Sequence, residues 1–310
     1  MKAFVLLNPY ANRWQAGAHR QALEEALRAA GVPYHLEVSQ RRRHAIPLVA
    51  RAVREGYAPI IAAGGDGTIG EVVNGIAQAL GPEGAWPPLG VLPLGTANDL
   101  VDNVGLPRQL TNAARVIATG KTRPMDVVQI QVRNAAGETH TWYSANNTAL
   151  GLEPTITHIQ QEMTWAKGNL RYLLATLAGI LRHPVWEAEL RWEGGSYQGP
   201  VNLISVGNHR RTGGLFYMTP HADGFDGRLT FIFAYAKSRL RVLQILPHAL
   251  KAEGDDLSTV PEVHEIHSPF LEVHLETPSP MHADGELYET QALTLSFRTL
   301  PGQIPLLTPP

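Results

Sequence analysis

The sequence predicts two fold classes in one chain of 310 residues: an N-terminal doubly wound α/β domain and a C-terminal, antiparallel β-sandwich-like domain. Three observations support this prediction. Up to about residue 120, apolar runs alternate with segments of helical period. A glycine-rich turn, Gly64 to Gly70, separates one such run from the segment that follows it. Beyond Asp126, short runs of alternating polarity separated by turn residues replace the earlier pattern.

The first domain is expected to contain four strand–helix units. Its strands are apolar runs that end at turn residues, and its helices carry apolar residues three and four apart. The expected strands are 3–7, 34–38, 59–63 and 89–92, and the expected helices are 17–30, 45–55, 68–80 and 110–119. Such units build a parallel sheet with helices on both faces, and ligands bind at the carboxyl ends of its strands.

The second domain is expected to consist of short antiparallel strands interrupted by two helices. The expected strands are 127–132, 139–146, 186–192, 201–206, 229–234 and 270–275, and the expected helices are 170–181 and 240–251. A last strand, 292–297, could return to either domain, and the proline-rich end from Pro301 is expected to be poorly ordered. The predicted boundaries are therefore 1–125 for the α/β domain, 126–290 for the sandwich-like domain, and 291–310 for the terminal strand and tail.

Composition excludes several classes of function. The formal net charge is −2, which gives no reason to expect a nucleic-acid partner. The absence of cysteine excludes disulfides, zinc–thiolate sites, iron–sulfur clusters and thiol catalysis, and it is compatible with a cytoplasmic protein. The N-terminus has no signal-peptide pattern, and the apolar segment 170–181 is too short to span a membrane. Contact with a membrane surface stays open.

The glycine-rich turn has the layout of a phosphate-binding loop. Gly64, Gly65 and Gly67 follow an apolar run, and without Cβ atoms the backbone can approach an anion closely. The expected helix after them would point its free N–H groups and the positive end of its dipole at the same place. The Walker pattern G-x-x-x-x-G-K-[ST] is absent, and a simple turn is the alternative. Asn74, farther along, is expected to pack or cap the helix rather than touch a ligand.

Two motifs carry a family resemblance. Gly-Gly-Asp-Gly-Thr at 64–68 and Leu-Gly-Thr-x-Asn-Asp at 94–99 together resemble the diacylglycerol kinase catalytic domain, in its soluble bacterial lipid-kinase branch, which is related to sphingosine and ceramide kinases. Further motifs follow in the family's order: Asn8-Pro9, Gly207-Asn208, Asp226-Gly227 and Asp284-Gly285-Glu286. The resemblance covers nearly the whole chain. It implies a nucleotide-binding α/β domain, a β-sandwich-like domain and an active site in the cleft between them.

The resemblance implies transfer of the γ-phosphate of ATP, with Mg²⁺, to a lipid hydroxyl, most readily that of diacylglycerol. The glycine loop would bind the ATP phosphates, Asn8 and Thr96 would border the same pocket, and Ser39 would contact the nucleotide. Thr96 could instead only form a turn. The loop residues assigned in this way are Gly64, Gly65, Asp66, Gly67, Thr68, Ile69 and Gly70.

Two carboxylates compete for the role of general base, by resemblance. Glu286 matches the base proposed for the family, whereas Asp66 matches the position assigned in sphingosine kinases. Partial removal of the hydroxyl proton in the transition state contributes about 10²–10⁴-fold to such reactions. An exposed turn carboxylate without a catalytic role is the alternative for Glu286.

Other acidic residues are expected to order the cleft or hold metal. By resemblance, Asp99 and Asp126 join a basic residue, here Arg13, and the trio could hold active-site Mg²⁺ through water; a structural salt bridge is a nearly equal alternative. The loop around Arg13 has Asn12 where the family has glycine, and asparagine tolerates left-handed backbone angles.

A second Mg²⁺ site is implied by the bacterial branch. Its ligands would be the carboxylate of Asp226 and the main-chain carbonyls of Asp223 and Arg228, oxygen donors that suit this ion. An Asp-Gly hairpin turn is the alternative. The basic loop 39–44 could meet phosphates or anionic headgroups, although a solvated loop is favoured. The apolar segment 165–181 could line an acyl-chain pocket, although an ordinary core helix is favoured.

The expected partner is a lipid substrate at the inner face of the cytoplasmic membrane, with transient peripheral contact, no nucleic acid, and a homodimer left open. Two alternatives are kept. A kinase of soluble substrates resembling NAD kinases shares the glycine loop but not the second motif. A regulator without turnover would account for the unusual residues Asn12 and Asp102, but Asp66, Thr96, Asp226 and Glu286 are all present and argue against it.

Overall fold

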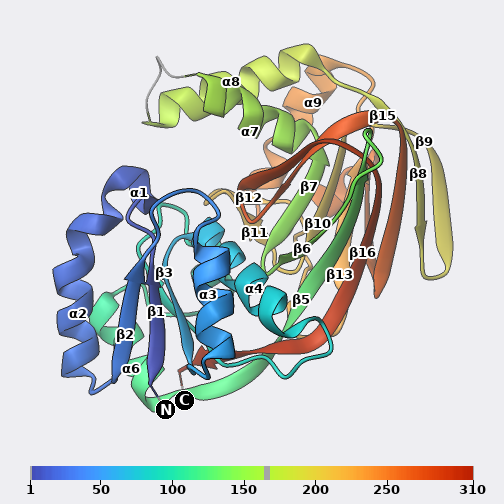
Figure 1. Cartoon of the computed structure of the whole chain (residues 1–310). Helices are drawn as coiled ribbons and strands as arrows, with labels where there is room; N and C mark the ends of the chain where they lie inside the picture. Colours follow the sequence, from blue (N-terminus) through green and yellow to red (C-terminus); the bar gives the residue numbers. More distant parts are fainter. Residues whose placement is uncertain (1, 164–167, 310) are drawn as a thin grey trace.

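A single mixed β-sheet runs through both domains of the computed structural model, which describes residues 2–163 and 168–309 (Figure 1). Within these residues the sheet has 14 strands, in the order β14-β13-β10-β7-β15-β16-β4-β3-β1-β2, with β5, β6, β8 and β9 paired to the side. The α/β domain occupies one end of this sheet and the β-sandwich the other, so the predicted fold class is confirmed.

The α/β domain is a four-stranded parallel sheet with helices on both faces. Its strands are β1 (Ala3–Leu7), β2 (Tyr34–Val38), β3 (Ile60–Gly64) and β4 (Leu89–Pro93), in the order β2-β1-β3-β4. Helices α2 (Arg20–Ala29) and α6 (Leu110–Thr119) cover one face, and α3 (Ala45–Arg54) and α4 (Asp66–Leu80) cover the other. Two apolar cores therefore flank the sheet. β1, β3 and β4 are buried throughout, which explains their apolar sequences, whereas the edge strand β2 is half-buried and carries polar residues.

The second domain is built from antiparallel strands that enclose a main apolar core, with a smaller apolar cluster beside it. Short strands alternate buried and exposed residues, as in β8, where one face packs inward and the other meets water. The strands are β6 (Thr139–Ser144), β7 (Asn147–Gly151), β8 (Trp186–Trp192), β9 (Gly195–Val201), β10 (Leu203–Gly207), β11 (Arg211–Thr212), β12 (Phe216–Tyr217), β13 (Leu229–Ala234), β14 (Val263–Ser268) and β15 (Phe270–Ala283).

Two long strands join the domains. β5 (Lys121–Asn134) and β16 (Glu286–Thr308) pair antiparallel along most of their length, and Leu306 of β16 pairs with Leu89 of β4. The expectation of a poorly ordered end from Pro301 was wrong, because Ile304 and Leu306 are fully buried in the core of the first domain. The last strand also begins earlier than expected, directly after the turn that follows β15.

The remaining helices lie around the site and at one end of the sandwich. α1 (Ala11–Trp14), η1 (Ala16–His19) and α5 (Asp99–Asn103) follow strand ends of the first domain. α7 (Leu152–Glu162), α8 (Gly168–Arg182) and α9 (Arg239–Ile245) gather at the top of the view, and two single turns, η2 (His248–Leu250) and η3 (Leu257–Thr259), follow α9 (Figure 1). In the expected helix 165–181, residues 165–167 lie outside the described residues. None of the described helices is both long enough and apolar enough to cross a bilayer.

Candidate active site

A hollow of about 600 Å³ lies at the carboxyl ends of β1, β3 and β4, where parallel sheets bind ligands. It is walled by the first domain except for one side chain of the second domain, Glu286. Asn8, Gly65, Asp66, Gly67, Thr68 and Thr96 line it, as the sequence predicts for a nucleotide site. The remaining lining residues are Tyr10, Ala11, Asn12, Gln40, Arg41, Arg42, Glu71 and Gly95.

The two glycine motifs touch each other at the floor of this hollow. A Cβ atom on Gly95 would lie 2.4 Å from the Cα atom of Gly65, so only glycine lets the loops after β3 and β4 come so close. Asn98, with φ of 52°, holds the second loop by accepting a hydrogen bond from the Gly95 N–H and donating one to the Gly95 carbonyl, both at 3.0 Å. This contact brings Thr96 to the same hollow as the first loop.

The N-terminus of α4 is left open toward the hollow. The residue before the helix is Gly65, and no side chain caps the helix there. The first N–H groups of a helix have no intrahelical partner, so they are available to an anion. Asn8 of the neighbouring strand end donates a hydrogen bond to the hydroxyl of Thr68 at 3.0 Å. Asn12 has φ of 50°, the left-handed turn that the sequence predicts for it.

Glu286 reaches the glycine loop because of the turn that precedes it. Asp284 and Gly285 have φ of 48° and 79°, and such Asp-Gly pairs form tight hairpin turns. The turn sets Glu286 at the start of β16, where a Cβ atom on Gly67 would lie 3.1 Å from its Cγ. Its carboxylate is paired with the guanidinium of Arg42 at 2.6 Å. Glu286 is therefore held in the hollow and is not a free turn carboxylate.

The basic loop before α3 is exposed, as expected, but two of its arginines, Arg42 and Arg43, also contact the second domain. The guanidinium of Arg43 lies 5.0 Å from the ring centre of Trp142 and 4.9 Å from that of Tyr288. Its backbone N–H donates to the carboxylate of Glu71 at 2.9 Å. Cation–π contacts of this kind were not visible in the sequence, because the two aromatic residues are about a hundred or more positions away.

Asp99 joins the two domains through a cation that the sequence did not single out. Its carboxylate accepts hydrogen bonds from the Gly214 N–H at 2.9 and 3.2 Å and lies 3.4 Å from the guanidinium of Arg211. Arg211 also pairs with Asp102. Arg13, the expected partner, lies in α1, but its side chain lies outside the described residues. Arg211 lies two positions before a glycine pair, Gly213-Gly214, which was the one available signal.

Asp126 lies at the point where β5 passes from one domain to the other, and it does not line the hollow. Its carboxylate accepts hydrogen bonds from the backbone N–H groups of Gly302 at 2.6 Å and Gly227 at 2.7 Å. Burial, followed by the charges of Asp226 and Asp223, raises its pKa. Among the described side chains no cation pairs with Asp126, so the structure supports a junction role rather than a network shared with Asp99.

Asp284 is a buried carboxylate to which the sequence assigned no role. It accepts hydrogen bonds from the Ser144 hydroxyl at 2.7 Å and from the three backbone N–H groups of residues 145–147, at 2.9 to 3.1 Å. A Cβ atom on Gly70 would lie 2.9 Å from its carboxylate. Gly70 therefore lets α4 approach the second domain, and Asp284 fixes the hairpin that carries Glu286.

Four predicted nucleotide contacts support the loop without lining the hollow. Ser39 is buried and donates its backbone N–H to the Leu7 carbonyl at 2.9 Å. Gly64 packs against the side chain of Thr68, and Ile69 lies in the apolar core. Gly70, as described, faces Asp284. The packing role expected for Asn74 is confirmed, because its amide exchanges hydrogen bonds of 2.7 and 3.0 Å with the backbone of Tyr143.

The turn predicted to bind a second metal is a closed loop beside Asp126. Asp226 accepts a hydrogen bond from the Arg228 N–H at 2.8 Å, and the Asp223 carbonyl accepts one from the Asp226 N–H at 3.4 Å. The guanidinium of Arg228 pairs with Glu193 at 3.2 Å. In the described part of the chain, no three His, Asp or Glu side chains are grouped to hold a metal. A site made of one carboxylate and two carbonyls stays a prediction.

Asp99 should make stability depend on pH. Burial, and then the charge of Asp66, raise its pKa from 3.8 to about 6. The folded state therefore holds an extra proton between these values, and stability is lost as the pH rises through 6. Asp99→Asn cannot ionise, so relative to wild type it should gain roughly 3 kcal/mol of unfolding free energy between about pH 4 and pH 7. Denaturant unfolding at a series of pH values measures this difference.

Asp102→Asn is the matched control for that measurement. A hydrogen bond from Arg108 lowers the pKa of Asp102. The contribution of Asp102 to the free energy of unfolding is therefore present above the pKa of an unfolded aspartate and is lost only at lower pH. The difference in unfolding free energy between Asp102→Asn and wild type should be constant above about pH 4.5. A constant difference for Asp99→Asn as well would contradict the assignment of a buried, proton-binding carboxylate.

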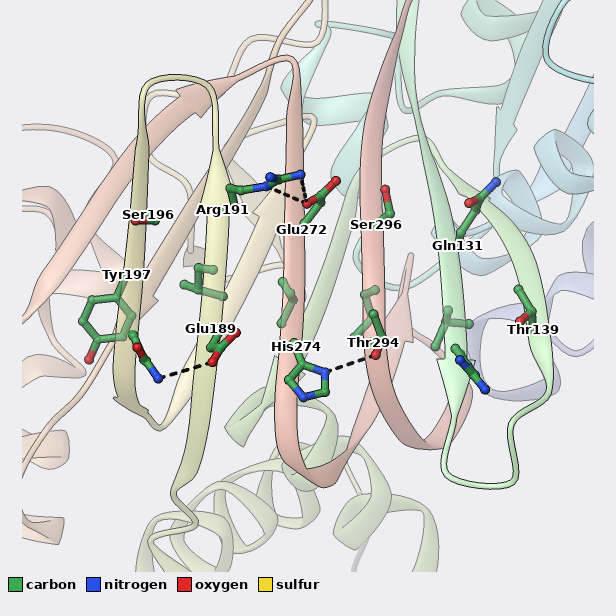
Figure 2. A pocket seen from close by; sticks show the side chains of 16 residues that line it. Gln131, Thr139, Glu189, Arg191, Ser196, Tyr197, Glu272, His274, Thr294 and Ser296 are labelled. Atoms are coloured by element: carbon green, nitrogen blue, oxygen red, sulfur yellow. Dashed lines mark hydrogen bonds and ion pairs between the residues drawn. The ribbon is translucent and has the colours of Figure 1, made fainter.

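A second hollow, similar in volume to the one at the glycine loop, lies on the outer face of the sandwich (Figure 2). Its polar side chains stand on neighbouring strands and pair with each other: Arg191 with Glu272 at 2.8 Å, and His274 with Thr294 at 3.3 Å. It contains neither a glycine loop nor a helix N-terminus. The hollow at the glycine loop is therefore the candidate active site.

Comparison with known families agrees with this geometry. Residues 2–130 match the family described as the diacylglycerol kinase catalytic domain. Residues 146–308, more than half of the chain, match the YegS C-terminal NAD kinase beta sandwich-like domain. A probable lipid kinase YegS from Escherichia coli O127:H6 is 28% identical over 285 residues, which cover 92% of this chain and 89% of that protein. A probable lipid kinase YegS-like protein from Klebsiella pneumoniae is 32% identical over 216 residues, 69% of each chain.

Solved structures show the same fold. A putative diacylglycerol kinase from Bacillus anthracis str. Sterne aligns with a TM-score of 0.77 at 22% identity, over all of this chain and 97% of that chain. Yeast NADH kinase, solved with NADH, aligns with a TM-score of 0.53 at 9% identity, over 99% of this chain and 82% of that one. Because both sequence families match in order and together span nearly the whole chain, the protein belongs to the diacylglycerol kinase catalytic-domain family, in its YegS-like bacterial branch.

Proposed function

We propose that this protein is an ATP-dependent lipid kinase that transfers the γ-phosphate to a lipid hydroxyl, with diacylglycerol or a related lipid as the acceptor. One observation carries the proposal. The open N-terminus of α4 and the carboxylate of Glu286 meet in one hollow, from opposite domains, at Gly67. A phosphate-binding surface and a candidate base are therefore adjacent.

The proposed reaction uses each of these groups once. The lipid hydroxyl oxygen forms a bond to the γ-phosphorus while the bond to the bridging oxygen of ADP breaks. The hydroxyl proton passes to the carboxylate of Glu286, which Arg42 holds in place at 2.6 Å. The N–H groups at the start of α4 stabilise negative charge on the phosphates. Asp66 lines the same hollow, but one of its oxygens already accepts the Leu100 N–H at 3.0 Å.

The carboxylates around the glycine loop fit Mg²⁺, which prefers oxygen ligands and retains water. Asp66 lines the hollow and would hold the ion there, whereas Asp99 does not line it and accepts the Gly214 N–H with both carboxylate oxygens. When bound, the ion would offset phosphate charge.

The test is transfer of labelled γ-phosphate from ATP, with Mg²⁺, into a panel of detergent-dispersed lipids, with NAD in a parallel reaction. The panel contains diacylglycerol, phosphatidylglycerol, ceramide and sphingosine. Label in one lipid is the expected result, and it names the acceptor. The fold likeness to an NADH kinase makes label in NAD alone the outcome that would assign a soluble substrate instead. ATP binding without labelled product in any reaction would indicate a regulator.

A further inference from the structure

Four leucines on two adjacent helices are exposed at one end of the sandwich. The exposed fractions are 43% for Leu177 and 53% for Leu181 on α8, and 65% for Leu240 and 40% for Leu243 on α9. We call these four residues the leucine ridge. α8 buries Ala175 and Ile180, as expected of a helix packed on the core, whereas its two leucines of the ridge lie exposed. Single exposed leucines are common, but a set on neighbouring helices marks an interaction surface.

The two helices are neighbours, not merely superimposed in projection. α8 contacts α9, and the imidazole of His183, directly after α8, is hydrogen-bonded at 2.8 Å to the carbonyl of Ala236, shortly before α9. α9 is unusual in its own right, since four of its seven residues are apolar and none of the seven is buried. A helix of this composition is stable on a protein surface when its apolar residues face another apolar phase.

The charged residues on the segments that carry the leucine ridge are all cationic. The segments 174–185 and 237–251 contain no aspartate or glutamate. Arg241 is paired with Glu262 at 2.6 Å, and Lys251 is paired with Asp255. Arg182, Lys237 and Arg239 have no ion-pair partner among the described side chains. Three unpaired cations around exposed leucines are complementary to a bilayer with anionic headgroups.

We propose that the leucine ridge and its three cations dock the protein on an anionic lipid bilayer. The proposal rests on the lipid acceptor proposed above, because docking would serve to bring the cleft to its substrate. Figure 1 shows α8 and α9 at the top of the second domain and α1 at the top of the first, and α1 contributes Ala11 and Asn12 to the active-site hollow. A second copy of the chain is a poorer occupant, since a twofold contact would set the same unpaired cations against each other.

The experiment is co-sedimentation with vesicles of phosphatidylcholine alone or mixed with phosphatidylglycerol. Wild type should bind the mixed vesicles, and added salt should weaken this binding. The double variant Leu240→Asp, Leu243→Asp should bind at least about tenfold more weakly, since two apolar contacts are lost and two negative charges are gained. Leu80→Asp, at the C-terminal end of α4, replaces a leucine outside the ridge whose exposed fraction, 37%, is close to the 40% of Leu243, and it should bind as wild type does.

Other results would overturn docking at this surface. Equal binding by wild type and the double variant would place the membrane contact elsewhere. A concentration-dependent dimer that the double variant abolishes, without vesicle binding by wild type, would assign the ridge to self-association. Phosphorylation of a short-chain, monomeric acceptor tests the proposed activity separately, and the double variant should retain it. Vesicle binding without phosphorylation of any lipid would leave docking supported and the proposed function rejected.

Discussion

Replacing Glu286 with glutamine should reduce kcat by about 10²–10⁴-fold, the usual contribution of a general base. Glutamine keeps the size of the side chain and its contact with Gly67, but it cannot accept the hydroxyl proton. ATP binding should change little, because the N-terminus of α4 and the loop contact between Gly65 and Gly95 remain. The measurement is kcat with the acceptor identified by the lipid panel, together with the Kd for ATP.

Asp66→Asn is the comparison that separates the two candidate bases. Asparagine can still accept the Leu100 N–H, so the loop should keep its shape. If Glu286 is the base and Asp66 holds Mg²⁺, both variants should lose activity, but only the loss in Asp66→Asn should shrink as the Mg²⁺ concentration is raised. A large loss in Asp66→Asn combined with near-normal kcat in Glu286→Gln would instead make Asp66 the base. Melting temperatures of both variants should stay close to that of wild type.

Replacing Asp284 with alanine should have the largest effect on stability. The change leaves the Ser144 hydroxyl and three backbone N–H groups without their acceptor in a fully buried site. Each unsatisfied buried donor costs about 1–3 kcal/mol, and relief of the buried charge offsets part of the total, so a net loss of at least about 3 kcal/mol is expected. Denaturant unfolding measures it.

Activity should fall with Asp284→Ala even where the variant is still folded. The hairpin turn that sets Glu286 against Gly67 would lose its anchor, so kcat measured in the cold should drop at least about tenfold. Asp256→Ala is the matched control, since Asp256 is also buried but caps only η3, through Ser258. Asp256→Ala should lower the free energy of unfolding by about 1 kcal/mol and leave kcat unchanged. Normal kcat in folded Asp284→Ala would show that Glu286 is positioned by other contacts.

Local sequence patterns were sufficient to predict the strands and helices of the first domain. The strands Ala3–Leu7 and Tyr34–Val38 and the helix Leu110–Thr119 have the predicted bounds, because apolar runs and helical periodicity are local signals. The glycine loop was found in the same way. In the second domain, α7 and β14 were missed, since short elements with mixed polarity carry weak periodicity.

The sequence by itself determined where a phosphate could bind, because glycines, a following helix and a strand end are contiguous in the chain. Only the tertiary structure decided what the acidic residues do. Asp99, Asp126 and Asp284 each accept backbone N–H groups from distant segments; Asp99 joins the two domains in this way, Asp126 lies at their junction, and Asp284 ties two segments of the second domain together. The sequence does not distinguish a carboxylate that binds a metal ion from one that binds a proton or accepts hydrogen bonds from three backbone amides. Those partners lie up to about 180 positions away along the chain and are brought together only when β5 and β16 cross between the domains.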